Sequence, residues 1–335
     1  MRIATYNVEW FNSLFDDANE LVRSQEWSAR YNVTKSQQAD ALACVFQAMD
    51  ADVVMIIEAP DTGGTRNVVQ ALENFAKVYG LRTHRAISGF ANNTRQEIAA
   101  LYDPAVVDLD HAPRAGTQDV PRFDGVFSID LDIDATKDEV QFSKPPFEIR
   151  ARTSSGAVFN LIGVHLKSKA PHGARSSDEE KRMGIANRRK QLAQAIWLRA
   201  RVDQMLDESQ SLIVLGDLND GPGLDAFEHL FGRSSVEIVL GDDPQKRLVD
   251  PHATYALSQR FGGVPTTARF WNKTDKRYFQ ALLDYVMLSP DLAAKEPVWR
   301  IWHPLDDPKC WNDPDLRQAL VTASDHFPVS VDLSI

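Results

Sequence analysis

The chain has few of the features that mark disulfide-built, zinc-ribbon or membrane proteins. Its 335 residues include 2 cysteines, Cys44 and Cys310, which lie far apart and form no C-x-x-C pair. This spacing argues against a disulfide framework or a cysteine-ligated zinc site and is typical of a reducing compartment. No run approaches the roughly 18 apolar residues of a membrane span, and the N-terminal segment lacks the apolar stretch of a signal peptide. We therefore expect a cytoplasmic protein without a membrane span.

Positive charge is also scarce. The chain has 37 Lys and Arg against 47 Asp and Glu, a formal net charge of −10 at pH 7. Proteins that bind duplex nucleic acid usually carry a basic face that neutralises phosphates. The acidic average lowers the expectation of tight non-specific DNA binding, leaves room for a local basic groove, and also fits a surface that simply favours solubility.

The chain contains short apolar runs, which predict strands, and amphipathic segments, which predict helices. Strands are predicted at 2–8, 52–57, 97–102, 127–133, 147–152, 157–166, 211–218, 282–289, 298–302 and 328–333. Helices are predicted at 35–49, 66–79, 179–206 and 222–231. Hairpins occur beside strand–helix–strand units, so an α+β fold is favoured over a doubly wound parallel sheet. We find no repeat or linker and expect a single domain over 1–335.

Polar side chains follow several of the predicted strands at the point where each apolar run ends. They are Glu58, His165, Asp217 with Asn219, and Asp325 with His326. Side chains that leave strand ends can meet at one rim, held by rigid elements. Carboxylates suit a hard cation and histidines suit proton transfer or charge stabilisation. No serine or cysteine stands in a nucleophile elbow.

Each of these residues alone also has a structural interpretation. A Glu after an apolar run is commonly a solvated strand end, Gly-Asp-Leu-Asn at 216–219 can be a turn, and Asp-His before a strand can be a cap. Their order along the chain favours function. Six stretches carry that order: Thr5-Tyr-Asn-Val-Glu-Trp, Ile56-Ile-Glu-Ala, Gly163-Val-His-Leu-Lys-Ser, Leu215-Gly-Asp-Leu-Asn-Asp, Leu283-Asp-Tyr-Val-Met-Leu-Ser and Ser324-Asp-His-Phe-Pro-Val.

Together these stretches resemble the endonuclease/exonuclease/phosphatase superfamily, which has the deoxyribonuclease-like fold. The resemblance implies a four-layer α/β/β/α sandwich, in which two mixed sheets lie face to face between helices. It covers nearly the whole chain, and two segments look long for the family, near 10–34 and 290–323. Aromatic residues in these inserts either stack on a flat substrate group or pack the inserts themselves, and packing is favoured.

The resemblance also implies a metal site. Glu58 would be the principal ligand, with Asn7 and Asp325 beside it, and such an oxygen-rich site suits Mg2+ or Mn2+. Glu9 occupies a position where the family varies, so it either joins the metal site or faces solvent.

The catalytic roles follow from the same resemblance. Asp217 would orient and deprotonate the attacking water, helped by Asn219, and His326, held by Asp284, would stabilise charge on the scissile phosphate. His165 resembles a second histidine of the deoxyribonuclease branch, which a glutamate on a neighbouring strand supports. Glu97 is the matching glutamate here.

A basic segment follows directly after His165, at residues 165–190. We expect Lys167 and Lys169 in it to contact a substrate phosphate or a nucleic-acid backbone. The remainder of the cluster is equally well explained as a solvated helix face.

The sequence thus predicts a metal-dependent phosphoesterase that hydrolyses a phosphodiester bond by in-line attack of an activated water. A nuclease acting on nucleic acid is the first expectation. The alternative is a phosphodiesterase or phosphatase acting on a small-molecule, sugar-phosphate or lipid-headgroup ester. A non-catalytic binding module is a remote third, because no expected catalytic position is replaced. Nothing in the sequence indicates the oligomeric state.

Overall fold

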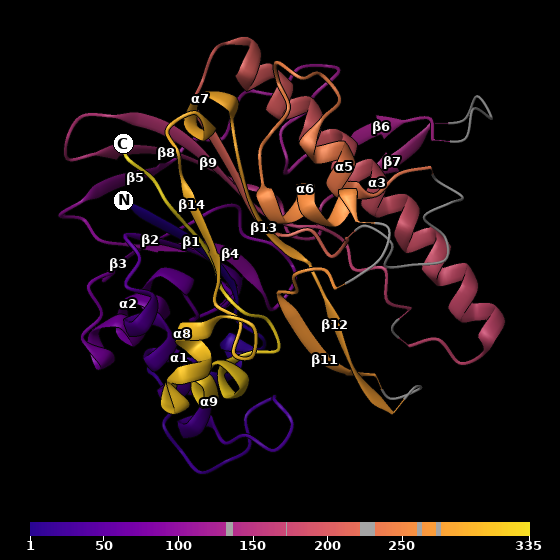
Figure 1. Cartoon of the computed structure of the whole chain (residues 1–335). Helices are drawn as coiled ribbons and strands as arrows, with labels where there is room; N and C mark the ends of the chain where they lie inside the picture. Colours follow the sequence, from indigo (N-terminus) through magenta and orange to yellow (C-terminus); the bar gives the residue numbers. More distant parts are fainter. Residues whose placement is uncertain (132–136, 172, 222–231, 260–262, 273–275) are drawn as a thin grey trace.

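The computed structural model describes residues 1–335 apart from 132–136, 172, 222–231, 260–262 and 273–275. Two mixed β-sheets form its framework, and helices flank them (Figure 1). This arrangement confirms the predicted α/β/β/α sandwich.

The first sheet brings the two ends of the chain together. Its strand order is β14-β15-β1-β2-β4-β3. The strands are β14 (Val298–Ile301), β15 (Val329–Asp332), β1 (Arg2–Asn7), β2 (Val53–Ala59), β4 (Glu97–Tyr102) and β3 (Arg85–Ser88). β1 is parallel to β2 and antiparallel to β15, so the first and last strands are neighbours.

The second sheet has the order β13-β10-β9-β8-β5. The strands are β13 (Asp284–Leu288), β10 (Leu212–Asp217), β9 (Val158–His165), β8 (Phe147–Thr153) and β5 (Val107–His111). β9 and β10 run parallel, while β13 pairs with β10 in the antiparallel sense. Two hairpins lie outside both sheets: β6 (Phe127–Ile129) with β7 (Asp138–Val140), and β11 (Ala268–Asn272) with β12 (Arg277–Ala281).

Alternating side chains explain why the strands read as unbroken apolar runs. In β2, Val53, Met55 and Ile57 pack between the sheets, whereas Val54 and Ile56 face the outer helices. A strand that is buried on both faces must be apolar at every position. The predicted strands therefore reflect two cores, one on each face of the sheet.

Helices cover the outer faces of both sheets. α1 (Lys35–Met49), α2 (Val68–Tyr79) and α9 (Pro314–Ala323) share a core with the first sheet. α3 (Ser177–Asp207), α5 (Ser235–Leu240) and α6 (Pro251–Ser258) share one with the second. The short elements η1 (Phe11–Leu14), α7 (Pro290–Ala293) and α8 (Pro308–Asn312) complete the described fold. None of its helices is long and apolar enough to cross a membrane.

Local signals set the helix ends. Thr34 and Gln37 form a capping box at the start of α1, and Gly80 ends α2 with a left-handed φ of 61°. The prediction of a helix over 35–49 is therefore correct to the residue. The strand predicted over 127–133 ends at Ile129 in the described part, and the helix predicted over 222–231 lies outside the described residues.

Candidate active site

Strand register brings the predicted polar residues together. Asp217 at the end of β10 lies opposite His165 of β9 on one side and opposite Asp284 of β13 on the other. Across the sandwich, Asn7 and Glu58 close the parallel strands β1 and β2. Asn7, Glu58, His165, Asp217, Asn219, Asp325 and His326 all line one cavity of about 600 Å³. The strand ends thus meet at one rim, as the sequence predicted.

Asp217 is held by donors on several sides. Asn7 Nδ2 donates to its Oδ2 at 3.0 Å, and Asn219 donates to Oδ1 through its backbone N–H at 2.7 Å and to Oδ2 through Nδ2 at 3.2 Å. Burial raises the pKa of Asp217 to about 7, and nearby Asp284 adds to this while His326 opposes it. A fixed carboxylate that titrates near neutral pH is suited to general-base chemistry.

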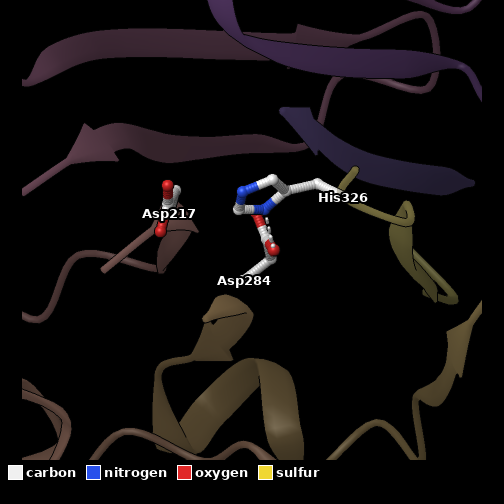
Figure 2. Close-up of side chains that lie close together, drawn as sticks. All are labelled: Asp217, Asp284 and His326. Carbon is white, nitrogen blue, oxygen red and sulfur yellow. Dashed lines mark hydrogen bonds and ion pairs between the residues drawn. The ribbon is translucent and has the colours of Figure 1, made fainter. Parts of the chain in front are cut away.

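His326 is oriented by Asp284. The Nδ1 of His326 lies 2.8 Å from Asp284 Oδ2, which also accepts from the Thr267 hydroxyl at 2.8 Å. Figure 2 shows the imidazole between Asp217 and Asp284. Burial opposes the imidazolium most strongly of the single causes, but the carboxylates of Asp284, Asp217 and Asp325 together raise the pKa of His326 well above its usual value. The ring therefore carries a positive charge at neutral pH.

Glu58 stands at an irregular point of its strand. The pairing of β2 with β4 shifts register between Ile57 and Ala59, and Glu58 has a left-handed φ of 62°. A bulge of this kind re-aims a side chain that a regular strand would point elsewhere. Burial raises the pKa of Glu58, with Lys144 and His326 acting in the opposite direction. Glu58 also accepts a hydrogen bond from the Gln96 amide.

Two groups of residues, in the lining of this cavity or directly behind it, could hold a divalent cation. Asn7, Glu58 and Asp325 offer oxygens, and Asn7 Oδ1 is buried without a hydrogen-bond partner among the described residues. An orphaned buried oxygen beside two carboxylates fits Mg2+ or Mn2+. The second grouping, Asp217, Asp284 and His326, has ligand atoms within 4.8 Å of one another. Its Asp284–His326 hydrogen bond already uses one donor and one acceptor, so we favour the first grouping.

Sequence reasoning missed Lys144. Its Nζ donates to Gln96 Oε1 at 2.7 Å and lies 3.3 Å from His165 Nδ1. Burial, followed by Lys144, His326 and Lys167, lowers the pKa of His165 well below its usual value, so this histidine is neutral. A single lysine in a loop carries no signal of its own, and only the fold brings Lys144 into the cavity.

The Glu97 side chain is held by Thr62. Its carboxylate accepts from the Thr62 backbone N–H at 2.9 Å and from the Thr62 hydroxyl at 3.4 Å, and it does not line the cavity. Because successive residues of an extended chain point to opposite sides, Gln96 reaches the cavity and Glu97 does not. Lys144 lies against the His165 ring in this structure, so the expected support of His165 by Glu97 stays a prediction.

The two lysines of the basic segment separate. Lys167 lines the cavity, and burial lowers its pKa with help from Lys190. Lys169 instead donates to buried Asp220 at 2.6 Å, outside the cavity lining. The prediction that Lys169 contacts substrate is not supported by this placement, because a buried carboxylate requires a cationic partner.

Comparison with known proteins defines the class. The profile of the Endonuclease/Exonuclease/phosphatase family matches residues 4–326. The chain belongs to this family, whose members are generally hydrolases of phosphoesters that depend on a divalent metal. No curated protein matches the chain in a sequence search.

Solved structures of low sequence identity share the fold. Truncated TDP2 from Caenorhabditis elegans superposes with a TM-score of 0.53 at 12% identity, covering 100% of this chain and 97% of that one. Humanized D. rerio TDP2 gives a TM-score of 0.52 at 13% identity, with 100% and 99% coverage. An endonuclease/exonuclease/phosphatase family protein from Bacteroides thetaiotaomicron gives 0.50 at 15%, with 99% and 97% coverage.

Proposed function

We propose that the protein is a Mg2+- or Mn2+-dependent phosphodiesterase of the nuclease type, which cleaves its substrate by in-line attack of an activated water. The observation that carries this proposal is one cavity with a carboxylate that titrates near neutral pH, Asp217, and an imidazolium fixed by a second carboxylate, His326. A general base and a fixed positive charge are what phosphodiester hydrolysis needs.

Each residue then has a defined task. Asp217, oriented by Asn7 and Asn219, takes the proton of the attacking water. His326 donates one hydrogen bond, from Nε2, to a phosphoryl oxygen and its positive charge stabilises the charge that develops there, while Asp284 holds the ring through Nδ1. A cation held by Glu58, Asn7 and Asp325 would supply further charge neutralisation when bound.

The cavity also contains groups that suit a phosphate and a flat ring. Neutral His165 and the cations Lys144 and Lys167 lie on one side, where they can contact non-bridging oxygens. Trp10, with 44% of its surface exposed, also lines the cavity and can stack on a base. These features favour a nucleic acid as substrate.

One observation favours the alternative, a small-molecule, sugar-phosphate or lipid-headgroup ester. Two cations of the basic segment, Lys169 and Arg188, form ion pairs with buried Asp220. The segment therefore offers less free charge for a long backbone than its composition predicts.

Both cysteines are free, which is consistent with the cytoplasmic location that we propose.

The first experiment measures hydrolysis of plasmid DNA, bis-p-nitrophenyl phosphate and p-nitrophenyl phosphate with Mg2+, Mn2+ or excess chelator. Asp217→Asn and His326→Ala test the site, and Asp108→Asn, at an exposed carboxylate of β5, is the matched control. We expect plasmid nicking that chelator and both site variants abolish, with the control active. Cleavage of the small esters alone would establish the alternative. Full activity of Asp217→Asn would refute the mechanism.

A further inference from the structure

A second cavity, of about 750 Å³, lies behind one wall of the active site. Residues 30–33 of the loop before α1 form one side, α1 and α9 form the floor, and the β11–β12 hairpin closes it. Figure 1 shows that hairpin projecting away from the two sheets. The lining residues that matter below are Arg30, Tyr31, Arg269, Tyr278 and Ser324.

Three contacts connect the two cavities. Arg30 lines the second cavity and forms an ion pair with Glu9, which lines the first. The backbone N–H of Arg269 donates to the Asp325 carbonyl at 2.7 Å. Ser324 Oγ donates to the Asn7 carbonyl at 2.8 Å and accepts from Glu9 N–H at 3.2 Å. The two cavities are therefore adjacent, and residues that line one contact residues that line the other.

The chemistry of the second cavity suits a phosphate beside a flat ring. The Arg269 guanidinium lies 3.7 Å from the centroid of the Tyr278 ring and, among the described residues, has no carboxylate partner. Within the described part of the chain, its Nε is buried without a hydrogen-bond partner, as is the Nε of Arg30. Tyr31 and Tyr278 expose their rings, at 98% and 53%. Arginine binds phosphate in a bidentate manner, and an exposed aromatic ring stacks on a base.

Two acidic residues limit how much negative charge the cavity accepts. Asp40 is already paired with Arg23 at 3.0 Å and with the Tyr79 hydroxyl at 2.7 Å. Asp315 lies in the first turn of α9, where the helix dipole favours a carboxylate. The arrangement therefore suits one phosphate group rather than a long polyanion.

We propose that this cavity binds the nucleotide next to the scissile phosphate, with its phosphate on Arg269 and its base against Tyr278. The inference rests on the proposed function and narrows it to substrates with a second phosphate near the scissile bond. A single strand of nucleic acid supplies such a group, and so does a small nucleotide with two phosphates.

The test measures binding of fluorescein-labelled octathymidylate by anisotropy in excess chelator, where no hydrolysis occurs. Arg269→Gln should weaken binding about tenfold, as expected for one charge-assisted hydrogen bond. It should also lower the slope of log K against log salt by about 0.7, the value for one phosphate contact on a single strand. Tyr278→Ala should weaken binding about tenfold by loss of one stacking ring.

Arg85→Gln is the matched control, because this substitution removes the same charge as Arg269→Gln. Arg85 lies on the edge strand β3 and is in the lining of neither cavity. Melting curves establish that the variants are folded. Competition by thymidine 3′,5′-bisphosphate as effective as that by unlabelled octathymidylate would assign the cavity to a small nucleotide, whereas weaker competition would assign it to a strand. Affinity of Arg269→Gln within twofold of wild type, or equal losses in the control, would overturn the proposal.

Hydrolysis of bis-p-nitrophenyl phosphate, which has no second phosphate, separates this inference from the proposed function. Wild-type hydrolysis of that ester supports the proposed reaction whatever the binding result. If binding depends on Arg269 but no substrate is hydrolysed, the nucleotide-binding role of the second cavity is supported and the proposed hydrolysis reaction is refuted. Where both activities exist, the ratio of kcat/KM for the oligonucleotide to kcat/KM for the ester should fall about tenfold in Arg269→Gln. An unchanged ratio would mean that Arg269 acts only through Asp325.

Discussion

Replacing Asp284 by Asn isolates the charge that holds His326 in its active form. The substitution keeps the shape of the side chain and an oxygen that can accept from His326 Nδ1, now 2.8 Å from Asp284 Oδ2. It removes the carboxylate that contributes most to raising the pKa of His326 against burial. Asp217 and Asp325 remain in the variant, but the pKa of His326 falls.

The magnitude follows from the hydrogen bond. A buried hydrogen bond to a charged group contributes about 1.5–3 kcal/mol, and about 1.4 kcal/mol corresponds to a factor of ten in rate. We therefore expect kcat/KM to fall about 10- to 100-fold near neutral pH. The loss of kcat/KM should depend on pH. The raised pKa of His326 keeps the wild-type ring protonated as pH rises through neutrality. The variant ring loses its proton at lower pH, so the loss should grow with pH.

The assay is a pH profile of kcat/KM for bis-p-nitrophenyl phosphate in saturating Mg2+, with Asp108→Asn as the control. The variant should approach wild type at the acidic end and diverge at the basic end. A loss of equal size at every pH would show that Asp284 only orients the ring. No loss at all would refute the role of the Asp284–His326 pair.

Three further experiments, with five substitutions, test other parts of the site and of the fold. Glu58→Gln should raise the Mg2+ concentration for half-maximal activity at least about tenfold, measured by metal titration. An unchanged Mg2+ concentration would show that Glu58 is not a ligand of the cation. Lys167→Ala should raise KM about tenfold. Lys169→Ala should instead lower the unfolding free energy by about 1–3 kcal/mol and leave KM nearly unchanged. A raised KM with unchanged stability in Lys169→Ala would identify Lys169 as a substrate contact. Gly216→Ala should destabilise by more than about 3 kcal/mol in urea unfolding, because φ is 137° and a Cβ would overlap a backbone carbonyl of β9. Gly63→Ala, which meets nothing within 4 Å, should stay within about 0.5 kcal/mol.

The framework of the fold was readable because its strands are buried on both faces. A run such as Val53–Ile57 has no polar position, and its length identifies a strand without any periodicity. The edge strands β3 and β5 were missed for the opposite reason, since they are short and partly exposed, as are the proline-started helices α6 to α9. Short edge segments carry too few apolar residues to form a pattern.

The candidate site was predictable where a residue ends a strand and less so elsewhere. Asn7, His165 and Asp217 close regular strands, so the topology alone places them. Lys144 comes from a loop, and its approach to His165 depends on packing that no local pattern encodes. The contact of Lys169 with substrate stays a prediction, because the sequence cannot show that the neighbouring Asp220 is buried and pairs with this lysine.

The hydrogen bond from Ser324 to the Asn7 carbonyl joins residues 317 positions apart. It has a consequence for the timing of activity during synthesis. The first strand is made early, yet its partner β15 and the imidazole of His326 arrive only with the final segment of the sandwich. Contacts this distant in sequence form late, after the intervening chain has folded. A nascent chain therefore lacks the imidazole, and the candidate site is complete only when the last strand docks.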